Sequence, residues 1–164
     1  MAYDFNLDEV FEMAIQIEAN GAKFYRRAAD LQKDDENKAF LEKLARMEDR
    51  HKSTFEAMRR EVSDGEKKPT VFDPANELSM YLKAMADAHG GEGSPDIADA
   101  FTGEEPIQEI ITTAIGLEKE SILFYLGLKD LVPPKYGHER LDEIIKEEKL
   151  HIAQLTGFLK KARS

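Results

Sequence analysis

Apolar residues recur every three or four positions in four long segments of the chain, a spacing that is typical of amphipathic helices. In the first segment Val10, Phe11, Ala14 and Ile17 fall on one predicted helix face. The pattern predicts an all-α protein with four long helices. These helices are expected at residues 7–31, 36–63, 104–131 and 138–161.

The connections between the predicted helices are short, long and short in turn. A polar cluster at residues 33–35 separates the first two helices, and Pro133-Pro134 ends the third. Prolines and a glycine-rich run interrupt residues 66–103, where only 75–88 has helical periodicity. This arrangement predicts an antiparallel four-helix bundle with one long crossover that contains a short helix.

The length of 164 residues is that of one domain with a sizeable core. Asn6 with Glu9, and Thr102 with Glu105, have the spacing of capping boxes before the first and third helices, and Gly65 is a natural stop for the second. We therefore expect one domain at residues 1–164. It should consist of a helical hairpin at 7–64, a crossover at 65–103 and a second hairpin at 104–161.

The second half of the chain repeats polar residues of the first half at an offset of 100 residues. Residues 14–25 (AIQIEANGAKFY) align with residues 114–125 (AIGLEKESILFY), and residues 41–51 (LEKLARMEDRH) with residues 141–151 (LDEIIKEEKLH). The repeated polar residues interrupt the apolar faces, although a single glutamate on a helix is usually exposed. They are Glu18, Glu48, His51, Glu118, Glu148 and His151.

The spacing of these residues places them at one level of the bundle. Residues equidistant from the turn of an antiparallel hairpin lie at the same height, and the midpoints between the paired glutamates fall at residues 33 and 133, both in predicted turns. Each histidine follows a glutamate by three residues, so the two side chains share a helix face. The fold should therefore bring all six side chains together.

Four buried carboxylates require positive charge nearby, because removing each one from water costs several kcal/mol. Two divalent cations would neutralise them, and imidazoles add neutral nitrogen ligands. Carboxylate and imidazole ligands suit iron or manganese better than thiolate-selective metals, and bridging carboxylates can hold two ions about 3.5–4 Å apart. The hypothesis is a metal centre of two iron ions at the six repeated residues, with manganese or zinc as alternatives.

Other polar residues near the repeat have less defined roles. Glu147 lies four residues before His151 and is an alternative ligand to Glu148, which matches the repeat better. Tyr25 and Tyr125 follow Glu18 and Glu118 by seven residues. They are interpreted as core tyrosines first, and second as accessory residues that hydrogen-bond to a ligand carboxylate or take part in electron transfer. His89 and His138 are expected at the surface, and no catalytic residue is expected beyond the metal centre.

Composition narrows the choice of partners. The formal net charge of -10 argues against binding to nucleic acid or to an anionic membrane surface. The absence of cysteine excludes disulfides, thiolate metal sites and iron–sulfur clusters. Neither a secretory signal nor an apolar run of the ~20 residues that span a bilayer is present, so a cytoplasmic location is expected.

With these motifs the sequence resembles the ferritin-like di-iron carboxylate superfamily, and within it the rubrerythrin-like branch. That pattern is one glutamate on each of two helices and Glu-x-x-His on each of the other two. The resemblance covers the four long helices and implies a ferritin-like fold. The matching residues are Glu18 and Glu118, Glu48 with His51, and Glu148 with His151.

The resemblance implies a homodimeric oxidoreductase that reduces hydrogen peroxide or O2 with electrons from an external donor protein. Two features depart from the family. Ser121 stands where rubrerythrins often carry a further glutamate, and Glu120 points about 200° away from Glu118 around the helix. The four cysteines of a rubredoxin domain are absent.

Two other functions remain as alternatives. One is a ferroxidase or other iron-handling ferritin-like protein, which would need a closed shell of subunits to store iron. The chain reaches Ser164 soon after the fourth predicted helix, which favours a dimer over such a cage. The other is a non-catalytic helical bundle stabilised by metal, for which zinc would serve as well as iron.

Overall fold

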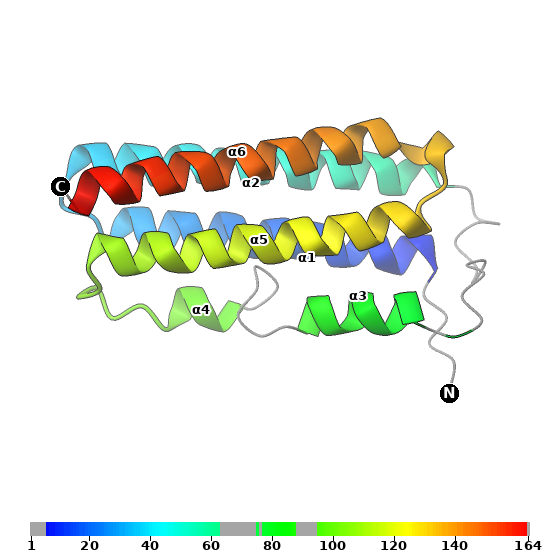
Figure 1. Ribbon diagram of the computed structural model, residues 1–164, viewed down its shortest axis with the longest axis horizontal. Coiled ribbons are helices and arrows are strands. Elements are labelled where there is room, and N and C mark those ends of the chain that lie inside the picture. Colours follow the sequence, from blue (N-terminus) through cyan, green and yellow to red (C-terminus); the bar gives the residue numbers. More distant parts are fainter. Residues whose placement is uncertain (1–5, 63–74, 76, 88–94, 164) are drawn as a thin grey trace.

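Four long helices form an antiparallel bundle in the computed structural model, which describes residues 6–62, 75, 77–87 and 95–163 (Figure 1). The predicted bundle is confirmed, and no strand occurs among the described residues. No helix in these ranges is long and apolar enough to cross a membrane. The elements are α1 (Leu7–Asp30), α2 (Asp35–Glu61), α3 (Glu77–Asp87), α4 (Pro95–Asp99), α5 (Ile107–Leu131), a 3-10 turn η1 (Pro134–Tyr136) and α6 (His138–Arg163).

The helix ends follow local capping chemistry in the first hairpin. The Asn6 side chain accepts a hydrogen bond from the Glu9 backbone amide at 2.8 Å, and the Glu9 carboxylate accepts one from the Asn6 amide at 3.1 Å. The predicted capping box is therefore present. Asp34 begins α2 by accepting from the amide of Asn37 at 2.9 Å. Val62 is the C-cap of α2, and Gly65 lies outside the described residues.

The second predicted capping box is wrong. Glu105 does accept hydrogen bonds from the Thr102 backbone amide and hydroxyl, at 2.7 and 2.9 Å, but within the turn that precedes α5. The N-cap of α5 is Pro106, which has no capping side chain. The helix therefore begins at Ile107, three residues later than predicted, because the Thr102–Glu105 bonds close a separate turn.

The crossover contains two short helices where the sequence predicted one. α3 packs along α5, and α4 packs against α1 (Figure 1). α4 has only five residues, too few for an apolar period to be visible, and begins at Pro95, a residue that favours the first helical position. A β-carbon at Gly127 would lie 2.4 Å from the Tyr81 ring, so this glycine allows α3 to approach α5 closely.

Two apolar clusters fill the bundle on either side of the repeated polar residues. Along α1 the first cluster ends at Ile17, Glu18 follows, and the second cluster begins at Phe24. α2, α5 and α6 show the same division, each in its own direction. The core is therefore an apolar layer, a polar layer and a second apolar layer along the bundle axis. The polar layer is the candidate site.

Candidate metal centre

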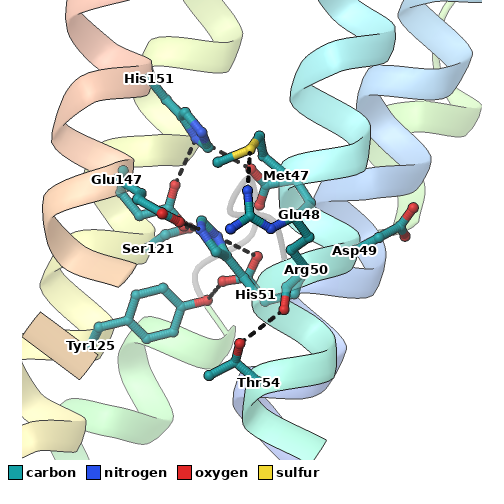
Figure 2. A network of polar contacts seen from close by, with 12 residues as sticks. Met47, Glu48, Asp49, Arg50, His51, Thr54, Ser121, Tyr125, Glu147 and His151 are labelled. Carbon is teal, nitrogen blue, oxygen red and sulfur yellow. Dashed lines mark hydrogen bonds and ion pairs between the residues drawn. The ribbon is translucent and has the colours of Figure 1, made fainter. Parts of the chain in front are cut away.

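The six repeated residues meet in the polar layer and are almost entirely shielded from solvent. All four glutamates are 0% exposed, and both histidines are 2% exposed. Each long helix contributes to the layer, because each hairpin places its glutamates at equal distance from its turn. Figure 2 shows part of this network, with the side chains of α2 facing those of α5 and α6. The geometric prediction is confirmed, and the role of these residues as ligands remains a proposal.

The donor atoms form two groups that share two glutamates. Within each group, one donor atom from every residue lies within 4.8 Å of the others. Glu48 and Glu148 belong to both groups, so they are placed to bridge two ions. Glu18 and Glu118 each belong to one group and could act as terminal ligands. The groups are Glu18, Glu48, His51 and Glu148, and Glu48, Glu118, Glu148 and His151.

Both histidines point Nδ1 into the carboxylates. The Nδ1 atom of His51 lies 3.4 Å from Glu18 Oε2 and 3.2 Å from Glu148 Oε1. The Nδ1 atom of His151 lies 2.9 Å from Glu148 Oε2 and 3.4 Å from an oxygen of Glu118. These contacts are ion pairs, and neither Nδ1 atom, nor either oxygen of Glu148, is satisfied by a well-aligned hydrogen bond among the described residues. Buried polar atoms left in this way suit ligands of a cation.

Two buried tyrosines connect the hairpins through the polar layer. Tyr25 of α1 donates a hydrogen bond of 2.5 Å to Glu118 of α5, and Tyr125 of α5 donates one to Glu18 of α1. Both rings are at most 1% exposed, so they are core residues as well. The structure therefore combines the two interpretations of these tyrosines. Each hydroxyl fixes one oxygen of a terminal glutamate and leaves the other oxygen for a metal ion.

The remaining candidates lie outside the two groups. The Glu147 side chain is 35% exposed and contacts the Nε2 atom of His51 at 2.6 Å. Glu148, the candidate that matches the repeat better, is the one that lies in both ligand groups. Ser121 is buried, but its hydroxyl donates to the Leu117 carbonyl at 3.1 Å. A ring nitrogen of His138 contacts the Val132 carbonyl at the α5–α6 turn. His89 lies outside the described residues.

Without bound metal, the two imidazoles carry part of the charge compensation. Burial lowers the pKa of His51, but hydrogen bonding and charge from Glu18 and Glu147 outweigh burial and raise this pKa to about 9. Burial likewise opposes the effect of Glu118 and Glu148 on His151, whose pKa also rises to about 9. Both rings should then be protonated at neutral pH, so a metal ion must displace a proton from each ring in order to bind.

The pKa values of two of the buried carboxylates shift in opposite directions. Burial raises the pKa of Glu148 well above its usual value, and the charges of Glu118 and Glu18 raise it further. The pKa of Glu118 is lowered in spite of burial, because His151, Glu148 and Tyr25 hydrogen-bond to it. The metal-free layer is therefore stabilised by protons on Glu148 and both histidines, which two cations would displace.

Comparison with known proteins supports the fold and part of the motif. The sequence model of the rubrerythrin family matches residues 1–59, which contain α1 and most of α2. A candidate ferritin-like diiron-carboxylate protein from Thermotoga maritima, known from a crystal structure, has a TM-score of 0.71 to this chain. It shares 23% sequence identity, over 99% of both chains. No curated protein matches.

These matches and the buried carboxylate–imidazole cluster support a di-iron protein. The family match covers Glu18, Glu48 and His51, and the second half of the chain supplies their counterparts 100 residues later. The resemblance inferred from the repeated glutamates and histidines is therefore confirmed: the chain is similar to the rubrerythrin-like branch of the ferritin-like fold.

Proposed function

We propose that the chain is a di-iron oxidoreductase of the rubrerythrin type, which reduces hydrogen peroxide or O2 with electrons from an external donor protein. The observation that carries the proposal is the pair of overlapping groups of buried ligands. Four carboxylates fully removed from solvent are unfavourable in an inert core, and their charge matches two divalent ions. Two iron ions bound there would supply the two electrons that, with two protons from solvent, convert one hydrogen peroxide to two molecules of water.

The protein residues would hold and tune the metal pair. Glu48 and Glu148 would bridge, and the four carboxylates would favour the increase in total metal charge from +4 to +6 on oxidation. Tyr25 and Tyr125 would keep Glu118 and Glu18 oriented through their hydrogen bonds. The apolar layers above and below would exclude water and preserve the strength of these interactions.

A surface cleft of about 350 Å³ beside His51 favours a small oxidant as substrate. Its lining includes His51 and Glu147, so it reaches the polar contact next to the buried layer. The ring of His51 lies between this cleft and the buried carboxylates that face its Nδ1 atom. Ferroxidase activity is the second candidate, because it would use the same two groups of buried ligands.

Metal stoichiometry and single turnover test the proposal. Protein purified without added metal should contain iron, and the metal-free chain should take up two Fe(II) ions under anaerobic conditions. One portion of hydrogen peroxide should then oxidise two Fe(II) ions per peroxide, measured by ferrous chelation. Glu118→Ala should lose this activity, whereas His138→Ala, outside the layer, should behave like the unmodified chain.

Three outcomes separate the candidates. Binding of one ion at saturation would overturn the dinuclear centre. Two tightly bound ions that peroxide and O2 leave reduced would favour a metal-stabilised bundle. Rapid oxidation of excess Fe(II) with retention of Fe(III) in a particle larger than a dimer, measured by size-exclusion chromatography, would favour iron handling.

A further inference from the structure

One of the positions at which the hundred-residue repeat fails lies directly beside the proposed ligands. Residue 147 is glutamate, and its counterpart 100 residues earlier is Met47. The six proposed ligands match across the repeat, so the two metal positions have the same first ligands. Glu147 and Met47 are therefore a difference beside two positions whose proposed ligands match.

Glu147 completes the surroundings of His51. Its Oε2 atom lies 2.6 Å from Nε2 of His51 (Figure 2). The other ring nitrogen, Nδ1, faces Glu18 and Glu148. A carboxylate in this place accepts the Nε2–H bond and so leaves the lone pair of Nδ1 for a metal ion. It also makes the imidazole more basic and the position more negative.

His151 lacks an equivalent acceptor. Its Nε2 atom has no hydrogen-bond partner among the described residues. The Met47 thioether, a weak acceptor, instead receives a contact from the Arg50 guanidinium at 3.4 Å. Neither the tautomer nor the orientation of the His151 ring is therefore fixed by a carboxylate, although its Nδ1 atom faces the ligands in the same way.

We propose that Glu147 is a positioning residue that makes the two metal positions unequal, the position of Glu18 and His51 binding its ion more tightly than that of Glu118 and His151. The inference rests on the proposed metal centre. Carboxylate partners of metal-bound histidine typically change affinity by about 10–100-fold. The Glu147 side chain is 35% exposed, so solvent screening places the expected effect near the lower end of this range.

Titration of the metal-free full chain with Co(II) tests the inequality, with optical absorption and calorimetry as readouts. The unmodified chain should bind two ions in two steps whose dissociation constants differ by about tenfold or more. Glu147→Met should weaken the first step about tenfold, so that the two steps merge. Met47→Glu should strengthen the second step, because it gives His151 the missing acceptor.

Two further variants separate orientation from charge. Glu147→Gln keeps an oxygen that can accept from Nε2–H, and it should retain most of the two-step binding. Glu143→Met removes a carboxylate from the same cleft, one helical turn away and outside both ligand groups, and should leave the first step unchanged. Equal weakening by Glu143→Met and Glu147→Met would show a general charge effect and overturn the positioning role.

Proton NMR of the Zn(II)-loaded chain provides a readout that does not depend on affinity. The Nε2–H proton of His51 should exchange slowly with solvent in the unmodified chain and in Glu147→Gln, and rapidly in Glu147→Met. Two bound ions with unchanged steps and unchanged exchange in Glu147→Met would overturn this inference and leave the centre intact. Fewer than two ions in the unmodified chain would overturn the proposed function and this inference together.

Discussion

The two apolar layers and the polar layer between them are built from the same four helices but are stabilised by different forces. In the apolar layers Phe11, Leu41 and Leu155 are fully buried among other apolar side chains. Their burial contributes about 1.5–3 kcal/mol per large side chain. In the polar layer Glu18 is buried to the same extent, and its burial opposes folding unless charge compensates it.

The difference between the layers explains how the bundle stays folded around a buried polar layer. Hydrophobic burial at both ends of the bundle holds the helices in register, whether or not the polar layer is satisfied. The polar layer then needs only partial compensation, which His51, His151 and the tyrosines provide. Stability and metal chemistry are thus assigned to separate layers, and substitutions in each layer should respond differently to metal and to pH.

The largest expected effect comes from breaking an apolar layer. Phe11→Ala should lower the free energy of unfolding by about 3–5 kcal/mol, because it leaves a cavity in a closely packed cluster. The loss should be similar with and without metal, measured by urea unfolding. Leu150→Ala, at a side chain that is 54% exposed, should change stability by less than about 0.5 kcal/mol. A loss in Phe11→Ala that is much smaller with metal than without it would show that the layers are not independent.

Metal addition should act only through the polar layer. At a free metal concentration of 100 times the dissociation constant, the folded state gains about 2.7 kcal/mol. Thermal melting of the unmodified chain at pH 7 should therefore shift upward with Fe(II) or Co(II). Glu118→Ala, which removes a terminal ligand from one of the two groups, should show a smaller shift, because the group of Glu18 and His51 stays complete. Identical melting curves of the unmodified chain with and without metal would mean that the glutamates do not form the centre.

The sequence predicts the layers well where the pattern is local or repeated. The helix positions follow from apolar periodicity, and α1, α2 and α6 begin and end within two residues of expectation. The six candidate ligands follow from the offset of 100 residues, because equal spacing from two turns places them at one level. Both signals can be found without knowing how the hairpins pack together.

Other features depend on contacts between hairpins and could not be predicted in this way. The bonds from Tyr25 to Glu118 and from Tyr125 to Glu18 cross between α1 and α5, so spacing within one hairpin gives no sign of the partner. The Glu147 contact with His51 crosses from α6 to α2 and breaks the repeat. The assignment of Glu48 and Glu148 as shared residues likewise requires the relative placement of all four helices.

The pH response should distinguish the metal-free polar layer from the apolar layers. The pKa values of His51 and His151 are raised from 6.5 to about 9, so the folded state holds more protons than the unfolded state between these values. Their stabilisation is complete below pH 6.5 and is lost as pH rises through about 9. The metal-free chain should melt at progressively lower temperature from pH 6.5 to 9.5.

The metal-bound chain provides the matched control for this pH response. Bound imidazoles are neutral, so the folded state no longer takes up extra protons in this range. Its melting temperature should change much less between pH 6.5 and 9.5. Parallel pH curves for the two forms would indicate that the histidines are not protonated in the metal-free layer.

The smallest expected effect compares two glutamates within the polar layer. The raised pKa of Glu148 means that its ionised form is disfavoured in the folded state, chiefly by burial and then by the charges of Glu118 and Glu18. Above pH 4.5 the carboxyl loses its proton in the unfolded state but keeps it in the folded state, so stability falls as pH rises, and a neutral amide avoids this loss. Glu148→Gln should therefore stabilise the metal-free chain at pH 7.

Glu118→Gln should have the opposite sign, although both glutamates are 0% exposed and lie in the same layer. The pKa of Glu118 is lowered, so its ionised form adds stability above pH 4.5 through His151 and Tyr25. Removing that charge leaves the protonated His151 with fewer acceptors, and the free energy of unfolding at pH 7 should fall. Urea unfolding of the two variants without metal measures the difference directly. Equal shifts in one direction would mean that burial alone, rather than the pairing of each carboxylate, determines the stability of the layer.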